Sequence, residues 1–359
     1  MPGKELGVAV IGSGRMGRLR ASLSSTHPAV GFLGVADISE EVAQKLGEDV
    51  KADMATTEID KLILDPRVNA VFVSTPEGLH RHATVTALEA GKAVLVEKPI
   101  ALTLDDADEM IRVQEKTGGS LHVGYTRRYK DCYLRTKEQI VQGRLGKIVG
   151  AHTRVYNTRL QGLAILARDP HATPILDILT YYVDLMTWFM GDNPPVSVVA
   201  RGQTGVLKEA GYDAYDVTWA ILTMRDGAVV NMGVSYALPA NYPALGQTDR
   251  FEILGSDGTM MLDDDHTDHM LYTDKGIPHA YLKDRVINFA FLGGHSAGDW
   301  ALGSFWGGMA NEVRTWLDHL SLGLPLPSTT PREARQTLEI TLAVEEACHT
   351  GKEIRFGTN

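Results

Sequence analysis

The sequence is poor in cysteine and contains no long hydrophobic run. Its only two cysteines, Cys132 and Cys348, form no C-x-x-C pair, which argues against a disulfide framework and a cysteine-based zinc site. Without a run of 18 apolar residues, we expect no membrane span. The first residues carry neither a long apolar signal core nor twin arginines. We therefore expect a soluble, cytoplasmic protein with no membrane partner.

Basic residues are also few. The chain of 359 residues has 35 Lys and Arg against 45 Asp and Glu, a formal net charge of −10. Nucleic acid and anionic membranes are bound by surfaces with a basic excess, so we expect neither as a partner. With 44% hydrophobic and 22% charged residues, the composition is that of a globular protein, and its length suits two domains.

Apolar strands and helical patterns alternate through the first third of the chain. Strand-like runs cover 6–11, 31–37, 69–75, 92–97 and 120–125, and helical patterns lie between them at 15–25, 39–47, 78–90 and 104–117. Continuous apolar strands separated by helices indicate a parallel sheet covered on both faces. Because such crossovers are right-handed, we predict a doubly wound α/β domain over residues 1–126.

The pattern changes after residue 126. Five predicted strands follow, several joined by glycine-containing turns, at 147–157, 195–204, 214–224, 228–236 and 250–263. A long amphipathic helix over about 176–190 interrupts them, and helical segments near 303–320 and 331–349 end the chain. We predict an α+β domain over 127–359 around a mostly antiparallel sheet, with the last helix a candidate to pack back on the first domain.

A glycine-rich turn joins the first predicted strand to the first helix. The sequence GSGRMG follows the strand directly and opens the helix, as in a dinucleotide-binding βαβ unit. The first glycine would allow a tight turn, the second a close approach of pyrophosphate, and the third close packing of helix on strand. N–H groups at the helix start would hold phosphate; a plain β-turn-α connection is the alternative. The predicted cofactor-binding residues here are Gly12, Ser13, Gly14, Arg15, Met16 and Gly17.

Asp37 ends the second predicted strand, twenty residues after Gly17. A carboxylate there can accept both ribose hydroxyls of adenosine and would repel a 2′-phosphate, which favours NAD over NADP. The alternative is a helix cap, for which Ser39 is also available. Arg15 and Arg18 lie close by, so NADP remains open.

Small hydroxyl side chains end a strand at the edge where open α/β sheets bind ligands. Ser74, Thr75 and Pro76 terminate the strand 69–75, and we expect them to contact the ribose and phosphates of the cofactor, with a turn and helix cap as the alternative. His80 would face either solvent in the first helical turn or the nicotinamide.

Besides GSGRMG, three longer stretches carry recognisable motifs: STPEGLHRHATVTALEAGKAVLVEKPIALT (74–103), VGYTRRY (123–129) and LDILTYYVDLMTW (176–188). With GRLGKI (143–148) and ILGSDGTMML (253–262), the chain resembles the Gfo/Idh/MocA oxidoreductase family from end to end. The resemblance implies a Rossmann domain followed by an α+β domain with a large open sheet, and a homodimer or homotetramer. It also implies hydride transfer between a nicotinamide cofactor and a secondary alcohol or ketone of a sugar or cyclitol.

The Glu-Lys-Pro signature places the family's catalytic lysine at Lys98, which contacts the reacting hydroxyl in relatives. We expect Glu97 to line the cofactor site and Pro99 to follow a cis bond. The family's Asp-x-x-x-His pattern matches Asp177, but Tyr181 stands at the histidine position. Dimeric dihydrodiol dehydrogenases and the glucose–fructose oxidoreductase branch look similar there, so the resemblance suggests a tyrosine acid/base.

Asp177 and Tyr181 are four residues apart, so a helix places them on one face, which Asp184 continues. A free tyrosine has a pKa of about 10 and is a poor base at neutral pH, and an adjacent Lys98 ammonium would lower that pKa. Asp177 would hold Lys98 in place. The alternatives are an ordinary helical Tyr181 with Tyr182 as the functional ring, Asp177 as a helix-start acid, and Asp184 as a structural residue.

Further candidates for the substrate site lie near the expected domain junction, with solvated loop positions as their alternative. Arg127 follows the strand 120–125 and can contact substrate or cofactor, and Arg154 and Tyr156 share one side of a strand. Arg159 and His171 lie in the loops before the helix 176–190. The segment DDDHTDH (263–269) is rich in potential metal ligands, but a solvated acidic loop is favoured and we expect no metal.

The leading hypothesis is an NAD-dependent dehydrogenase acting on a ring hydroxyl of a sugar, glycoside or cyclitol. Two alternatives remain open. One is a trans-dihydrodiol or aldehyde-type reductase that uses NADPH. The other is a cofactor-binding regulator without catalytic activity.

Overall fold

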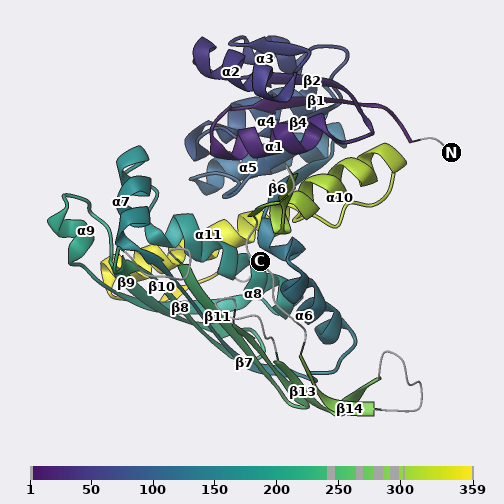
Figure 1. Cartoon of the computed structure of the whole chain (residues 1–359). Coiled ribbons are helices and arrows are strands. Elements are labelled where there is room, and N and C mark those ends of the chain that lie inside the picture. The colour runs from purple at the N-terminus through teal and green to yellow at the C-terminus, as the bar shows by residue number, and fades with distance from the viewer. Residues whose placement is uncertain are drawn as a thin grey trace. The chain divides into compact units, whose positions relative to one another are not determined.

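The computed structural model describes residues 3–240, 247–263, 270–278, 286–291, 299–301 and 304–357. The chain forms two compact units, Met1–Tyr129 with Ala297–Leu338, and Lys130–Ser296 with Glu339–Asn359 (Figure 1). The sequence-based division assigned 297–338 to the second domain, whereas these residues pack with the first unit. Among the described residues, no helix is long and apolar enough to cross a membrane.

The first unit contains a six-stranded parallel sheet in the order β3-β2-β1-β4-β5-β6. Its strands are β1 (Leu6–Ile11), β2 (Val30–Ala36), β3 (Met54–Thr56), β4 (Ala70–Val73), β5 (Ala93–Glu97) and β6 (Leu121–Gly124). This is the doubly wound Rossmann arrangement, and the predicted fold class is confirmed. The strand order reverses between β1 and β4, which is where such sheets bind ligands. The short β3 escaped prediction because three half-buried residues carry no clear pattern.

Helices from both ends of the chain cover this sheet. They are α1 (Arg15–Ser25), α2 (Glu40–Val50), α3 (Ile59–Ile63), α4 (His80–Glu89), α5 (Leu104–Thr117) and α10 (Gly308–Leu322). Helix α10 belongs to one apolar cluster with β1 and β4, in which Trp316 packs on Phe72 with ring centroids 4.7 Å apart. The late helix therefore completes the core of a domain whose strands lie in the first third of the sequence.

The second unit contains a nine-stranded sheet in the order β14-β13-β12-β11-β7-β10-β9-β8-β17. The strands are β7 (Ile148–Thr158), β8 (Pro195–Gln203), β9 (Val217–Met224), β10 (Val229–Leu238), β11 (Gln247–Gly255), β12 (Gly258–Asp263), β13 (Met270–Pro278), β14 (Val286–Phe291) and β17 (Ile354–Arg355). Among the described strands, β7 and β10 pair in parallel and the other neighbours are antiparallel. The prediction of a mostly antiparallel α+β domain is confirmed.

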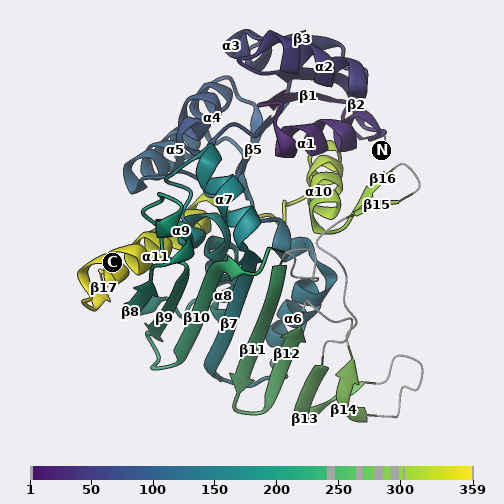
Figure 2. The same ribbon diagram turned by 60° about the vertical axis from the view of Figure 1, so that its left-hand side comes forward.

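One face of this sheet carries helices (Figure 2). They are α6 (Asp131–Val141), α7 (Arg159–Arg168), η3 (Ile175–Leu179), α8 (Thr180–Met190) and α11 (Pro331–Thr350), of which α11 begins in the first unit and ends in the second; a further short helix is α9 (Val206–Glu209). Val155, Leu222 and Phe251 point into the same apolar core as Leu179 and Leu185. The alternate residues of the strands point to the opposite face, which no described helix covers.

Candidate active site

The glycine-rich turn after β1 has the geometry that the motif predicts. Gly12 has a φ of +93°, and a Cβ there would lie 2.5 Å from the carbonyl oxygen of Ser74. A Cβ on Gly17 would lie 1.7 Å from the carbonyl oxygen of Gly12, whereas a Cβ on Gly14 would meet no atom within 4 Å. Two glycines are thus required by the fold itself. Gly14 instead leaves open space, as a site that receives an external group requires.

Helix α1 begins at the open side of this turn. Gly14 is its N-cap, no side chain caps it, and its first turn holds no acidic residue. Exposed Arg15 and half-buried Met16 are the first helical residues. Free N–H groups and the helix dipole favour an anion at such an end. Arg18, one turn later, pairs with Asp49 at 3.1 Å, which reduces its availability for a 2′-phosphate.

Asp37 follows β2 and is bound to the glycine turn. Its Oδ2 accepts a hydrogen bond from the backbone N–H of Ser13 (2.8 Å), and its Oδ1 accepts one from that of Ser39 (3.0 Å). Ser39 is the N-cap of α2, so Asp37 is not needed for that role. A carboxylate has about four acceptor positions, which leaves capacity on both oxygens of Asp37 for an additional donor.

Ser74 and Thr75 follow β4, beside the point where the strand order reverses. Their side-chain oxygens are buried and have no hydrogen-bond partner among the described residues. Most buried polar groups are paired, so two orphaned hydroxyls at a ligand-binding edge indicate that a ligand or water completes them. Together with the open space at Gly14 and the uncapped α1, they fit a dinucleotide. Pro76 is exposed and precedes the short helix η1 (Glu77–Leu79).

His80 is a buried link between two turns. Its Nδ1 lies 3.0 Å from the carbonyl oxygen of Pro99, and its Nε2 lies 3.1 Å from that of Thr75. Burial lowers the pKa of His80, which favours the neutral ring. The solvent-facing alternative is therefore wrong. The ring instead lies between the turn after β4 and the turn after β5, and in its neutral form its one N–H donates to only one of these carbonyls.

The Glu-Lys-Pro signature lies at the carboxyl end of β5. The Lys98–Pro99 peptide bond is cis, as predicted. Lys98 is half-buried between two buried neighbours, at the same edge of the sheet as Ser74. The Glu97 side chain differs from our expectation, because its Oε1 accepts from the Nε of buried Arg20 at 2.9 Å and only 8% of the side chain is exposed. Its carboxylate points to the interior instead of lining an open cofactor site.

In the second unit, Asp177 and Tyr181 lie on consecutive turns, as their spacing predicts. The helical stretch expected over 176–190 is present, but it begins as the π-helical turn η3 before continuing as α8. Asp177 lies in the π-turn and Tyr181 in the first turn of α8, and both are half-buried among buried neighbours. Single π-turns occur often at functional sites, because they shift the direction of one side chain.

Tyr236 is a functional candidate that sequence reasoning missed. Its hydroxyl donates to Oδ2 of Asp177. Burial, together with the Asp177 charge, raises the pKa of Tyr236 well above its ordinary value, so the phenol remains a hydrogen-bond donor. Alternation along β10 gave a signal, because Tyr236 shares the helix-covered face with Val230, Met232 and Val234 and is the one polar tip in that row.

Two further residues of α8 are interior. Tyr182 is fully buried and donates to Oδ2 of Asp249, so the alternative of Tyr182 as the functional ring is wrong. Asp184 is also fully buried, in agreement with a structural role.

The other residues predicted for the substrate site lie at different positions in the structure. Arg127 is buried in η2 (Thr126–Tyr129) of the first unit. Arg159 opens α7 and donates to the carbonyls of Ala237 and Leu238, next to Tyr236 in the chain. His171 is exposed in the loop before η3.

Tyr156 lies on the uncovered face of the large sheet. Its ring packs edge-on against Trp219 with centroids 6.3 Å apart, and the Arg154 guanidinium lies 4.8 Å from its centroid. Alternation therefore does pair residues 154 and 156, but on the face away from the helices that carry Asp177. The expectation that Tyr156 belongs to the same site is wrong for this reason.

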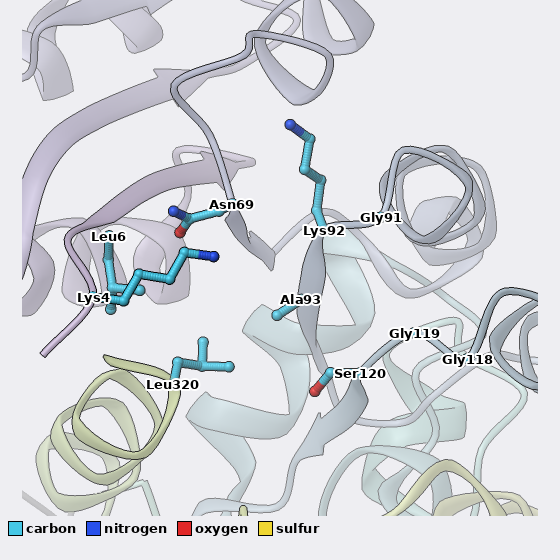
Figure 3. A pocket seen from close by; sticks show the side chains of 10 residues that line it. All are labelled: Lys4, Leu6, Asn69, Gly91, Lys92, Ala93, Gly118, Gly119, Ser120 and Leu320. Atoms are coloured by element: carbon cyan, nitrogen blue, oxygen red, sulfur yellow. The ribbon is translucent and has the colours of Figure 1, made fainter. Parts of the chain in front are cut away.

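A hollow of about 250 Å³ lies at the other edge of the Rossmann sheet (Figure 3). Leu6 and Ala93, which begin β1 and β5, line it, so it is at the amino edge and is distinct from the glycine turn. The part of the chain that the structure describes contains no group of three or more potential metal ligands. Residues 264–269 of the acidic segment lie outside the described residues.

Comparisons with known proteins agree with this geometry. Residues 6–125 match a family model described as the oxidoreductase family with an NAD-binding Rossmann fold, and residues 133–261 match the Gfo/Idh/MocA C-terminal domain. A myo-inositol 2-dehydrogenase of Thermotoga maritima is 24% identical over 360 residues, covering 97% of this chain and 98% of that protein. A 1,5-anhydro-D-fructose reductase of Ensifer adhaerens is 33% identical over 162 residues, but that match covers only 44% of this chain and 49% of the reductase.

The solved structure of scyllo-inositol dehydrogenase from Lactobacillus casei with NAD(H) and scyllo-inositol superimposes with a TM-score of 0.77. The two chains are 17% identical, and the match covers 98% of this chain and 99% of that one, which shows a common fold. Both domain models match in order along the sequence, and the strand order of the first sheet is that of a Rossmann fold. The chain therefore belongs to the Gfo/Idh/MocA oxidoreductase family.

Proposed function

We propose that this protein is an NAD-dependent dehydrogenase that oxidises a secondary ring hydroxyl of a sugar, glycoside or cyclitol, or reduces the corresponding ketone. The observation that carries this proposal is the carboxyl edge of the Rossmann sheet. There the open glycine turn and the orphaned hydroxyls of Ser74 and Thr75 accompany a half-buried Lys98. The names of the relatives, inositol dehydrogenases and an anhydrofructose reductase, supply the substrate class.

The cofactor would be held by groups of the first unit. The N-terminus of α1 binds the phosphates, and Asp37 accepts from ribose hydroxyls while it remains bound to Ser13. Its negative charge disfavours a 2′-phosphate, which supports NAD over NADP. When bound, NAD supplies the acceptor for the hydride that leaves the carbinol carbon.

The proton from the substrate hydroxyl requires a separate acceptor. Tyr181 takes this role as general acid/base, and the Lys98 ammonium stabilises negative charge on the substrate oxygen. The Tyr236 hydroxyl donates to Oδ2 of Asp177 and orients this carboxylate. Arg127, Arg159 and His171 remain proposed substrate contacts.

A homo-oligomer is the proposed assembly. The uncovered face of the nine-stranded sheet carries exposed apolar side chains on four strands, namely Trp219, Ile221, Val229, Leu254 and Met261. Contiguous apolar surface of this kind marks an interaction site in soluble proteins. Light scattering of the wild type and of Ile221→Asp would test this, and a monomeric wild type would refute it.

The function is tested by following NADH formation with a panel of sugars, glycosides and inositols. Lys98→Ala and Tyr181→Phe should each lower kcat by at least about 10²-fold, as expected for loss of a positioned acid/base or charge-stabilising group. Lys61→Ala and Tyr272→Phe are matched controls, because Lys61 and Tyr272 are exposed and their side chains contact nearby Glu58 and Asp274. Full turnover by both site variants would refute the proposed site.

A further inference from the structure

A fully buried arginine lies behind the Glu-Lys-Pro turn. Arg20 of α1 has no exposed side-chain surface, and its Nε and Nη2 each lie 2.9 Å from Oε1 of Glu97. Its Nη1 lies 2.6 Å from Oε2 of Glu312, a residue of α10 that is also fully buried. Arg20, Glu97 and Glu312, which we call the buried ion triad, thus join three elements distant in sequence: α1, β5 and α10.

Burying three charged side chains in a protein core is energetically unfavourable. Removing charges from water costs several kcal/mol per ion, and a well-packed apolar core is often at least as stable. Burial by itself lowers the pKa of Arg20, but the charges of Glu97 and Glu312 outweigh it and raise that pKa above its ordinary value. The guanidinium is therefore charged, and two carboxylates face one cation. A gain in stability alone is a weak reason for this arrangement, whereas fixed geometry is a strong one.

The triad has little freedom to move. A Cβ on Gly124 of β6 would lie 2.8 Å from Nη2 of Arg20 and 3.3 Å from Oε2 of Glu97, so the neighbouring strand already presses against both groups. On another side, the Arg20 guanidinium lies 5.4 Å from the centroid of the Phe72 ring. Glu312 is carried by a helix whose Trp316 packs on that same ring.

The buried ion triad includes Glu97, the residue directly before Lys98. The side chain of Glu97 is held by Arg20, and the carbonyl oxygen of Pro99 is held by the ring of His80 at 3.0 Å. Both chain neighbours of Lys98 are therefore held, Glu97 by its ion pair with Arg20 and Pro99 by its contact with the buried His80 ring. The direction in which the Lys98 side chain leaves the backbone depends on these two anchors.

We infer that Glu312 and Arg20 are positioning residues for Lys98, so that helix α10, from the C-terminal part of the chain, sets the geometry of the reaction. The inference rests on the proposed role of Lys98. It predicts that loosening the triad lowers kcat while the cofactor-binding turn, which has its own contacts through Asp37 and Ser13, keeps its affinity.

The test compares Glu312→Gln with Val313→Ala. The first removes one charge at nearly constant volume, and the second removes buried apolar contacts from the adjacent position of α10 without touching the triad. Glu312→Gln should lower kcat about tenfold, which corresponds to about 1.4 kcal/mol in the activation barrier, with the Kd for NADH within about twofold of the wild type. Val313→Ala should lower the melting temperature but leave kcat at 25 °C within about twofold. Arg20→Lys, which keeps the charge but loses the planar fork that reaches two carboxylates, should behave as Glu312→Gln does.

A second measurement reports on Lys98 without turnover. Reductive ¹³C-methylation gives each lysine a methyl resonance, and Lys98→Arg assigns the one from Lys98. That resonance should move in Glu312→Gln and stay in place in Val313→Ala. An unmoved resonance, or a kcat in Glu312→Gln equal to that of Val313→Ala, would overturn the inference. If Lys98→Ala itself kept full activity, the proposed function of Lys98 would fail instead, so the two failures are distinguishable.

Discussion

Replacing Gly14 by alanine should separate cofactor binding from folding. Gly14 has φ −69° and ψ −166°, which an alanine adopts without strain, and the added Cβ would meet no atom within 4 Å. Alanine is a poorer helix cap than glycine, but it also restricts the unfolded chain, and the two effects are of similar size, about 0.5–1 kcal/mol each. We therefore expect the free energy of unfolding to change by less than about 0.5 kcal/mol.

Binding should respond quite differently. The new methyl group would occupy the space that the pyrophosphate needs, and forcing one extra carbon into a close-packed contact costs about 1–3 kcal/mol. This corresponds to a roughly 5- to 150-fold increase in the Kd for NADH. Fluorescence titration with NADH measures the affinity, and thermal unfolding of the cofactor-free protein measures the stability.

Two other glycines provide the comparison. In Gly17→Ala the Cβ would lie 1.7 Å from the carbonyl oxygen of Gly12, so the backbone must shift and both stability and binding should fall. In Gly357→Ala the Cβ meets no atom within 4 Å and lies far from the turn in the chain, so neither should change. A folded Gly14→Ala variant that binds NADH as tightly as the wild type would refute the assignment of this turn to the phosphates.

Three further outcomes are expected. Asp37→Ala should raise the KM for NAD about tenfold and lower the ratio of kcat/KM for NAD to that for NADP; an unchanged ratio would remove Asp37 from cofactor selection. Tyr236→Phe should lower kcat and reduce the free energy of unfolding by about 1–2 kcal/mol, because Asp177 loses its buried donor. A kcat equal to that of the wild type would contradict the role of Tyr236 in orienting Asp177. Burial lowers the pKa of His122 to about 4, so between about pH 6.5 and pH 4 the unfolded chain binds a proton that the folded one does not. The melting temperature should therefore fall as pH falls through this range, and less steeply in His122→Asn; equal slopes would contradict this assignment.

The proposed catalytic residues differ in how far the sequence alone predicts their positions. Lys98, Asp177 and Tyr181 are recognisable from short patterns, because a strand end and an i, i+4 spacing are local properties of the chain. Tyr156 was assigned to the wrong face because alternation, which is also a local property, shows which residues share a face of β7 but not which face the helices cover. The latter depends on the pairing of β7 with β10 and β11, which are distant in sequence.

The sequence by itself determined the strand–helix alternation of the first domain and the glycine turn. These features follow from local periodicity and from residue types with narrow backbone preferences. Only the tertiary structure decided that α10 returns to the first unit, that Arg20 pairs with both Glu97 and Glu312, and that Tyr236 holds Asp177. Each of these is a contact between side chains 59 or more residues apart, which hydrophobic periodicity does not encode and which sheet register and helix packing alone bring together.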